Sequence, residues 1–330
     1  MAIAVRDDLL TDVDLLGTRI AAARAEIGRV IFGQREVVDQ VLITLLSGGH
    51  ALLVGVPGLG KTLLVETLGT VLGLAPKRVQ FTPDLMPADI TGSEVLDEDA
   101  AGKRSFRFVR GPVFCQLLMA DEINRASPRT QSALLQAMQE GRVAVGGIDH
   151  PLPRPFHVLA TQNPIEQEGT YPLPEAQLDR FLLQVDVAYP ALADERAMLL
   201  ATTGAAAGRA SPVLNGEELM AAQALIRRVP VGDSVVDAIL ALVRGARPET
   251  ASDESVRHHV AWGPGPRAAQ SLMLASRARA LLDGRLSPSL EDVAALAQPV
   301  LRHRMALNFS ARAEGVALAE VIDGLVGRLG

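Results

Sequence analysis

The spacing of apolar residues predicts two helices, then a strand, a loop and a third helix at the start of the chain. Between residues 15 and 30 apolar side chains recur every three or four positions, as in an amphipathic helix, and a second helix is expected at 35–46. The short apolar run at 51–54 predicts a strand, and helical spacing returns over 62–72 after a glycine-rich turn. The strand, turn and helix form half of a βαβ unit.

The following segments alternate strands with helices. A helix is expected at 128–139, and short apolar segments predict strands at 79–81, 106–109, 117–120, 157–161 and 182–187. This alternation predicts a parallel sheet covered by helices on both faces. Between Gly141 and Pro155 a Gly-Gly pair separates two short alternating stretches, which predicts a β-hairpin inserted in an α/β core.

The pattern changes after Pro190. An Ala- and Gly-rich stretch follows, and from about residue 217 only helical patterns remain, interrupted by prolines and glycines. A length of 330 residues allows two domains. We therefore expect an α/β core over residues 1–195, followed by an all-α lid domain of three to five helices over residues 196–330.

Composition and charge disfavour several functions. With 38 acidic against 32 basic residues the net charge is −6, so no basic field holds nucleic acid non-specifically. Eight Phe, two Tyr and one Trp leave little material for base stacking. Because the chain has neither a run of about 18 apolar residues nor a secretory signal, we expect a cytoplasmic protein without a membrane span. The single cysteine, Cys115, excludes an internal disulfide.

A phosphate-binding loop is predicted between the strand at 51–54 and the helix at 62–72. Residues 55–62, Gly-Val-Pro-Gly-Leu-Gly-Lys-Thr, match the pattern G-x-x-x-x-G-K-[ST] in the strand-loop-helix context that this motif requires. The glycines allow successive backbone N–H groups to face phosphate oxygens. Lys61 is expected to reach the β and γ phosphates of a nucleotide, and Thr62 to place its hydroxyl on Mg²⁺.

Two carboxylates end the predicted strand at 117–120. Asp121 and Glu122 are expected at the carboxyl edge of the sheet, beside the phosphate loop. Asp121 would hold Mg²⁺, directly or through water, and Glu122 would act as a general base or position the water that attacks the γ phosphate. A hydrolase needs such a base, whereas a metabolic kinase with the same loop does not, so the pair favours hydrolysis.

Three further polar residues are candidates for the site. Asn163 follows the strand at 157–161 and could donate to the γ phosphate or to water, although an Asn before proline is also typical of a turn. Arg180 ends a short predicted helix and could project toward the nucleotide of a neighbouring subunit, whereas Arg267 could touch the phosphate from within its own subunit. By spacing alone both arginines are more typical of solvated or paired side chains.

Taken together, these segments resemble the AAA+ ATPases, and specifically the MoxR family. The resemblance covers about residues 15–310 in order and rests on the phosphate loop and on four further blocks, at 81–95, 106–143, 160–183 and 263–269. It implies that Lys61 and Thr62 form Walker A and that Asp121 and Glu122 form Walker B. It also implies the remaining site roles, with sensor 1 at Asn163, the arginine finger at Arg180 and sensor 2 at Arg267.

The resemblance also implies nucleotide contacts and client contacts. The segment with Ile31, Gly33 and Gln34 resembles the stretch that contacts adenine. Further nucleotide contacts are expected along the loop and its helix, from Gly55, Pro57, Gly58, Leu59, Gly60, Lys61, Thr62 and Leu63. The hairpin at about 142–153 and the insert near 82–95 match two insertions of the clade that includes the magnesium-chelatase ATPase subunit, and they are candidates for client contact.

The function that the resemblance implies is hydrolysis of ATP, with Mg²⁺, by a ring of identical subunits, expected to be a hexamer. Such a ring would remodel or mature client protein complexes together with a von Willebrand factor A domain protein, a domain that this chain does not contain. The alternative is a nucleic-acid motor or loader, which the acidic composition and the lack of a helix-turn-helix signal oppose.

Cys115 is expected to be a buried small hydrophobe in a helix after Gly-Pro, and the adjacent His258 and His259 are not expected to share a metal.

Overall fold

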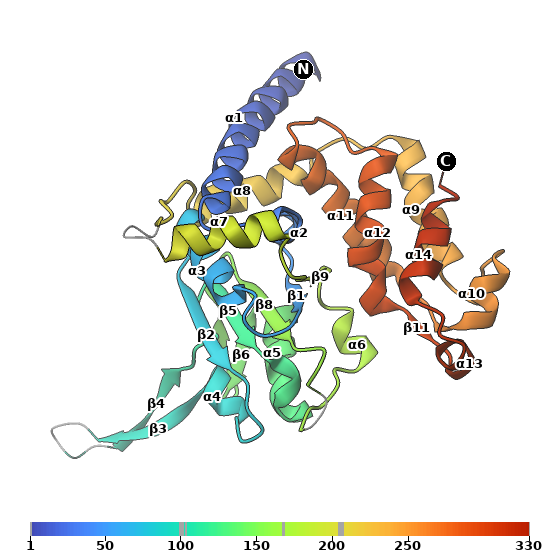
Figure 1. Ribbon diagram of the computed structural model, residues 1–330. Helices are drawn as coiled ribbons and strands as arrows, with labels where there is room; N and C mark the ends of the chain where they lie inside the picture. The colour runs from blue at the N-terminus through green and yellow to red at the C-terminus, as the bar shows by residue number, and fades with distance from the viewer. Residues whose placement is uncertain (1, 99–101, 103, 167–168, 204–207, 330) are drawn as a thin grey trace.

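The computed structural model describes residues 2–98, 102, 104–166, 169–203 and 208–329 (Figure 1). The first half of the chain contains most strands. Its elements are α1 (Ala2–Gly28), α2 (Arg35–Leu46), β1 (Ala51–Val54), α3 (Lys61–Val71), β2 (Pro76–Gln80), α4 (Pro87–Thr91), β3 (Gly92–Glu98), β4 (Arg104–Arg110), β5 (Leu117–Asp121), η1 (Ile123–Arg125), α5 (Pro128–Glu140), β6 (Arg142–Val145), β7 (Ile148–Pro151), β8 (His157–Gln162), α6 (Glu175–Leu178) and β9 (Leu183–Asp186).

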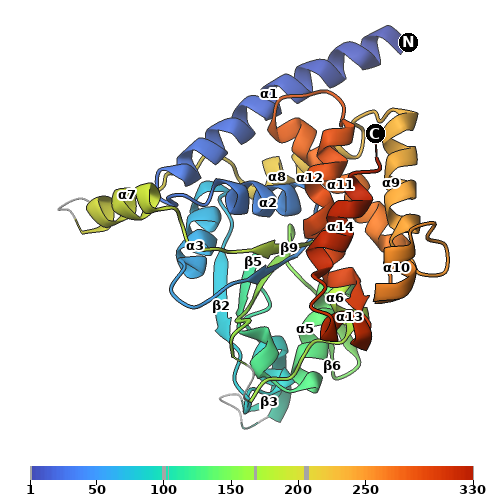
Figure 2. The ribbon, with the colours of Figure 1, turned by 45° about the vertical axis from the view of Figure 1, so that its right-hand side comes forward.

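The second half is mainly helical, and in Figures 1 and 2 its last helices form a group beside the sheet. Its elements are α7 (Leu192–Thr202), α8 (Gly216–Ile226), α9 (Asp233–Gly245), α10 (Glu254–His259), β10 (Val260–Trp262), α11 (Pro266–Leu282), α12 (Leu290–Leu301), η2 (Arg302–Arg304), β11 (Ala306–Leu307), α13 (Phe309–Ala313) and α14 (Leu318–Val326).

The central sheet confirms the predicted α/β core. Five parallel strands lie in the order β2-β5-β8-β1-β9. Successive residues of a strand face opposite sides, so Ala51 and Leu53 join one buried cluster with α2 and α3, whereas Leu52 joins a second cluster with α5. Helices therefore cover both faces. The carboxyl ends of β5, β8 and β1 lie side by side, which gathers whatever follows these strands at one edge.

The expectation that segment 106–109 belongs to the parallel sheet is wrong. The segment lies in β4, which pairs antiparallel with β3 in a separate hairpin, and Figure 1 shows this hairpin projecting from the core. A parallel strand buried on both faces needs a nearly continuous apolar run, but Arg-Ser-Phe-Arg-Phe-Val-Arg alternates with arginine. The insert expected near 82–95 forms α4 and the first residues of β3.

The inserted hairpin at about 142–153 is confirmed. β6 pairs antiparallel with β7, and Gly146 and Gly147 between them have φ of 58° and 79°. Two successive residues with positive φ form the tight turn that suits the twist of a hairpin. Cys115 is buried as expected, but it lies in a turn before β5 rather than in a helix. Burial raises the pKa of its thiol to about 11, so it remains protonated.

The helical part is more divided than the expected three to five helices with no strands. In the described residues 208–329 it contains seven α-helices, of which α10 and α13 are short, and β10 pairs with β11. Gly263 and the prolines near it separate β10 from α11. The apolar cluster on one face of the sheet continues into α8, α9, α11 and α12, so the boundary at residue 195 stays a prediction. Among the described residues no helix is long and apolar enough to cross a bilayer.

Candidate functional site

The phosphate loop connects β1 with α3 at the carboxyl edge of the sheet. Gly58 and Gly60 have φ of 84° and 74°, a left-handed conformation that other residues rarely adopt. Gly60 precedes α3, and no side chain caps the N–H groups of the first turn of this helix. Free N–H groups and the positive end of the helix dipole form a site for an anion. The loop therefore has the geometry that phosphate binding requires.

Lys61 bends over the loop that it follows. Its Nζ donates to the carbonyl oxygens of Gly55 at 2.6 Å and of Val56 at 3.0 Å. Burial lowers the pKa of Lys61, and the charges of Asp121 and Glu122 act in the opposite direction. The ammonium and both carboxylates therefore interact within one site. The structure thus brings the predicted Walker A lysine and Walker B acids together.

A cavity of about 280 Å³ lies between the loop, the segment before α2 and the helix α7. The amide of Gln34 joins two of these parts because its Nε2 donates to Leu59 O at 3.0 Å. Gly33 has a φ of 68°, and a Cβ there would lie 2.4 Å from Asp194 Cβ, so α7 packs against a required glycine. The predicted residues that line the cavity are Ile31, Gln34, Pro57, Gly58, Leu59, Gly60 and Leu63. Tyr189, Glu195 and Met198 also line it and were not predicted from the sequence.

Asp121 ends β5 with its carboxylate held by two partners. Its Oδ1 accepts from Thr161 Oγ1 at 2.5 Å, and its Oδ2 accepts from Arg78 Nη2 at 2.6 Å and from Arg78 Nε at 3.1 Å. Thr161 lies on β8 and Arg78 on β2, the strands that flank β5. The parallel sheet therefore supplies both partners.

Glu122 has the one positive φ, 55°, among the described non-glycine residues. Its N–H donates to Thr161 Oγ1 at 2.8 Å, so one hydroxyl contacts both acids. Its Oε2 accepts from Gln80 Nε2 at 2.7 Å and from Arg125 Nη1 at 3.2 Å. The sequence pattern did not predict these partners. Thr161 carried a signal, as a polar residue within an apolar strand, but Gln80 is found only from the register that pairs it with Asp121.

Asn163 follows β8, which lies between β5 and β1, so it lies between the two acids and the phosphate loop. Its Oδ1 accepts from the N–H of Ile165 at 3.1 Å, a local turn of the kind that Asn favours. Its Nδ2 donates to Glu166 Oε2 at 3.4 Å. The turn geometry is present, and the role of Asn163 as a sensor stays a prediction.

Arg180 and Arg267 lie away from the phosphate loop of their own chain. Arg267 Nη1 is 3.4 Å from Asp179 Oδ2, and Asp179 directly precedes Arg180. Two residues after Arg180, the N–H of Leu182 donates to His50 O, just before β1. This is the amino edge of the sheet, roughly 13 Å along β1 from the start of the loop. Arg267 therefore lies beside the segment that carries Arg180, and its contact with a phosphate of its own subunit stays a prediction.

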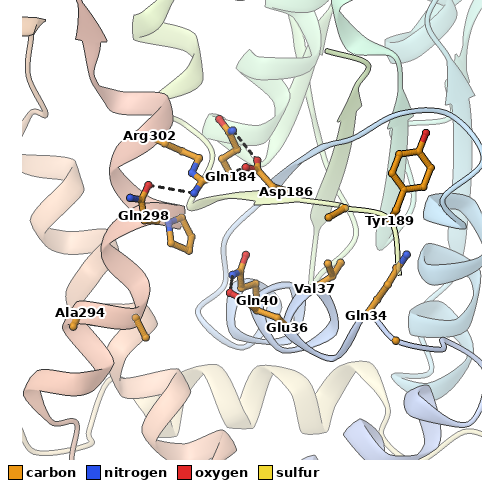
Figure 3. A pocket seen from close by; sticks show the side chains of 14 residues that line it. Gln34, Glu36, Val37, Gln40, Gln184, Asp186, Tyr189, Ala294, Gln298 and Arg302 are labelled. Carbon is orange, nitrogen blue, oxygen red and sulfur yellow. Dashed lines mark hydrogen bonds and ion pairs between the residues drawn. The ribbon is translucent and has the colours of Figure 1, made fainter. Parts of the chain in front are cut away.

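A second cleft of about 540 Å³ lies between the core and the lid (Figure 3). Residues of α2, β9 and α12 form its walls, and Arg302 at the end of α12 makes an ion pair with Asp186 at the end of β9. Gln34 and Tyr189 line both this cleft and the smaller cavity beside the loop. The cleft between core and lid therefore adjoins the cavity beside the phosphate loop.

The sheet order, the loop after β1 and the acids after β5 define a P-loop ATPase with a helical lid. The model of the ATPase family associated with various cellular activities (AAA) matches residues 50–183, and that of the AAA lid domain matches residues 252–324. The chain belongs to the MoxR family of AAA+ ATPases, because it is 43% identical over 299 residues to the protein named Chaperone MoxR1 of Mycobacterium tuberculosis, covering 90% of this chain and 78% of that protein.

Two further similarities extend over nearly the whole chain. It is 31% identical to Protein MoxR of Paracoccus denitrificans, covering 88% of this chain and 89% of that protein. A solved structure of a candidate ATPase from Cytophaga hutchinsonii superposes with a TM-score of 0.90 at 35% identity, covering 100% of this chain and 99% of the other. The chain is therefore a chaperone-like AAA+ ATPase with both the core and the lid of its relatives.

Proposed function

We propose that this chain hydrolyses ATP between neighbouring subunits of a ring and uses the energy to remodel or mature client protein complexes. The observation that carries the proposal is the grouping of Lys61, Asp121 and Glu122 at one edge of the sheet, where both carboxylates act on the ammonium. A base beside the metal ligand suits attack by water on a γ phosphate. The acidic net charge gives no support to a nucleic-acid motor.

The residues fit ATP and Mg²⁺. Loop N–H groups bind the phosphates, and Lys61 exchanges the carbonyls of Gly55 and Val56 for phosphate oxygens. The carboxylate of Asp121 and the hydroxyl of Thr62 are oxygen ligands of the kind that Mg²⁺ prefers, and the ion, when bound, neutralises phosphate charge. Arg78 occupies Oδ2 of Asp121, whereas Oδ1 accepts a single bond from Thr161 and keeps a site for the metal or for one of its waters.

Glu122 takes the proton of the attacking water in this mechanism. Its Oε2 is bonded to Gln80 and Arg125 in this structure, so Oε1 is the oxygen that accepts the proton. The amide of Asn163 positions the water or reads the γ phosphate without a change of charge. Arg180 belongs to the neighbouring subunit's site, since it lies far from its own loop, and it stabilises charge in the transition state.

Replacing the loop lysine tests nucleotide binding. In Lys61→Ala we expect the affinity for ATP to fall at least about 100-fold, because the ammonium beside the phosphates is lost. Lys77→Ala is the matched control, since Lys77 is an exposed lysine on β2, and we expect its affinity to equal that of the wild type. Isothermal titration with ATP measures both. Equal affinity of Lys61→Ala and wild type for ATP would contradict the proposal that Lys61 and its loop bind the phosphates.

The surface of α7 supports a ring. Its 11 residues include no buried side chain, and Leu192, Leu199 and Leu200 are exposed apolar residues beside the nucleotide cavity. An exposed apolar face of this kind marks an interaction surface. We expect Glu122→Gln with ATP to form a hexamer, measured as mass by light scattering. A monomer at every nucleotide and protein concentration would contradict the ring.

The two inserted hairpins are proposed to contact the client. The hairpin of β3 and β4 exposes Leu96 and Phe106, and the hairpin of β6 and β7 exposes Ile148. Family resemblance adds a von Willebrand factor A domain protein as the proposed partner. We expect Glu122→Gln, held with ATP, to retain a client that the double variant Glu122→Gln/Phe106→Ser loses, measured by pull-down and mass spectrometry. Identical captured sets would exclude Phe106 from the client contact.

A further inference from the structure

Arg304, at the end of η2 in the lid, is almost completely buried, with its side chain 1% exposed. All three guanidinium nitrogens donate hydrogen bonds. Nε donates to Asp179 Oδ1 at 2.7 Å, Nη2 donates to Phe181 O at 2.6 Å, and Nη1 donates to Leu182 O at 3.1 Å. Nη1 also donates to Val300 O at 2.7 Å and Nη2 to Ser271 Oγ at 3.2 Å, both in the lid. A buried arginine is costly unless it is fully bonded, so Arg304 ties the lid to one segment of the core.

That segment contains Arg180. The acceptors at Asp179, Phe181 and Leu182 lie on both sides of Arg180, and His303 Nε2 lies 3.1 Å from the same Phe181 O. The side chain of Arg180 itself is half-buried, and the interaction found for it in the described part of the chain is with the charge of the exposed Glu140, whose pKa it helps to lower. The backbone around Arg180 is thus held from the lid while its side chain is available to a neighbour.

Asp179 also connects this segment to Arg267. Its Oδ1 accepts from Arg304 and its Oδ2 lies 3.4 Å from Arg267 Nη1, so two lid arginines share one carboxylate. The fork of a guanidinium fixes direction as well as distance, which a lysine in its place would not do. A movement of the lid therefore shifts the backbone that carries Arg180.

We propose that Arg304 and Asp179 are positioning residues for Arg180, so that the lid of one subunit sets the reach of the arginine that serves the next subunit's ATP. The inference rests on the proposed role of Arg180 in trans. A displacement of about 1 Å in a positioned catalytic group costs about 100-fold in rate. In Arg304→Lys we expect turnover to fall at least about tenfold, with the affinity for ATP within about twofold of wild type.

Mixed rings separate positioning from a merely structural role. Arg304→Lys subunits keep their own Glu122 but offer a misplaced Arg180, whereas Glu122→Gln subunits offer an intact Arg180. At a 1:1 ratio we expect about a quarter of wild-type turnover per subunit, because half of the sites can hydrolyse and half of those meet an intact neighbour. Each variant alone stays nearly inactive. The inference is overturned if this mixture does not recover turnover although a mixture of Arg180→Ala with Glu122→Gln does.

Arg180→Ala mixed with Glu122→Gln tests the proposed function in the same assay. If turnover recovers in this mixture but not in the mixture with Arg304→Lys, only the positioning role of Arg304 is rejected. If turnover recovers in neither mixture, the role of Arg180 in the neighbouring site is rejected as well. Asp179→Asn, which keeps the shape but not the charge, gives the same readout if Arg304→Lys does not fold.

The matched control is Arg285→Lys, since Arg285 forms a bidentate pair with the buried Asp292 in the lid away from this segment. We expect it to lose stability and keep wild-type turnover.

Discussion

At the scale of single residues, one hydroxyl organises the two acids of the site. Thr161 Oγ1 donates to Asp121 Oδ1 and accepts the N–H of Glu122. Glu122 adopts a left-handed conformation, which costs of order 1–3 kcal/mol for a residue other than glycine and persists only when its surroundings hold it. Thr161 is therefore as much part of the site as the acids, although it touches no phosphate in the proposed mechanism.

Replacing Thr161 by valine tests this role. Thr161→Val keeps the shape but removes the donor to the buried Asp121 Oδ1 and the acceptor of the half-buried Glu122 N–H, so we expect a loss of about 1–3 kcal/mol in the free energy of unfolding. We also expect ATP turnover to fall about tenfold or more, because both acids are displaced. Thr44→Val is the control, since Thr44 is equally buried but bonds only to Gln40 O within α2. Normal turnover in Thr161→Val would show that the acids hold their positions without it.

At the scale of elements, the half-buried His50 and the buried His157 lie at the amino ends of β1 and β8. His157 Nδ1 donates to Gly49 O at 2.8 Å, and its Nε2 accepts from Gln223 Nε2 at 3.1 Å, an arrangement that requires the neutral ring. Burial lowers the pKa of His157 to about 4 and that of His50 to about 3. Both imidazole rings are therefore neutral in the folded protein above about pH 4, whereas in the unfolded chain they protonate near pH 6.5.

This difference predicts acid sensitivity. Below pH 6.5 the unfolded chain binds a proton at His157 that the folded chain does not bind until about pH 4. Between pH 6.5 and pH 4, the contribution of this group to the free energy of unfolding therefore decreases by about 1.4 kcal/mol for each unit by which the pH is lowered. His157→Asn keeps a donor to Gly49, and we expect its unfolding free energy, measured with urea from pH 7 to pH 5, to fall less steeply. An unchanged slope would mean that His157 is charged in the folded protein.

The sequence alone is sufficient for the elements whose pattern is local. Continuous apolar runs that end in polar residues located β1, β5 and β8, and therefore the phosphate loop, the acids and Asn163. Arg78 and Gln80 could not be predicted as partners of the acids, because their contacts depend on the register of β2 against β5. The contact of Arg304 with Asp179 joins residues 125 positions apart and depends on how the lid packs. Packing between distant segments leaves no local pattern.

At the scale of the whole molecule, the lid contacts the core at two places with different consequences. Beside the nucleotide cavity, a cleft between α2, β9 and α12 separates the lid from the core, and Arg302 spans it to reach Asp186 (Figure 3). At the opposite edge of the sheet, Arg304 holds the segment of Arg180 without an intervening cleft. In the proposed mechanism, loss of the γ phosphate at the first place moves the arginine presented at the second and so links successive subunits of a ring.

The most direct test of this account is ATP turnover by Glu122→Gln, together with ATP affinity. We expect turnover at least about 100-fold below wild type, because the base is lost, and affinity equal to or above wild type, because the phosphate loop is intact. Glu217→Gln, an exposed acid in the first turn of α8, serves as the control and is expected to match wild type. Turnover of Glu122→Gln equal to that of the control would contradict the assignment of Glu122 and the proposed mechanism with it.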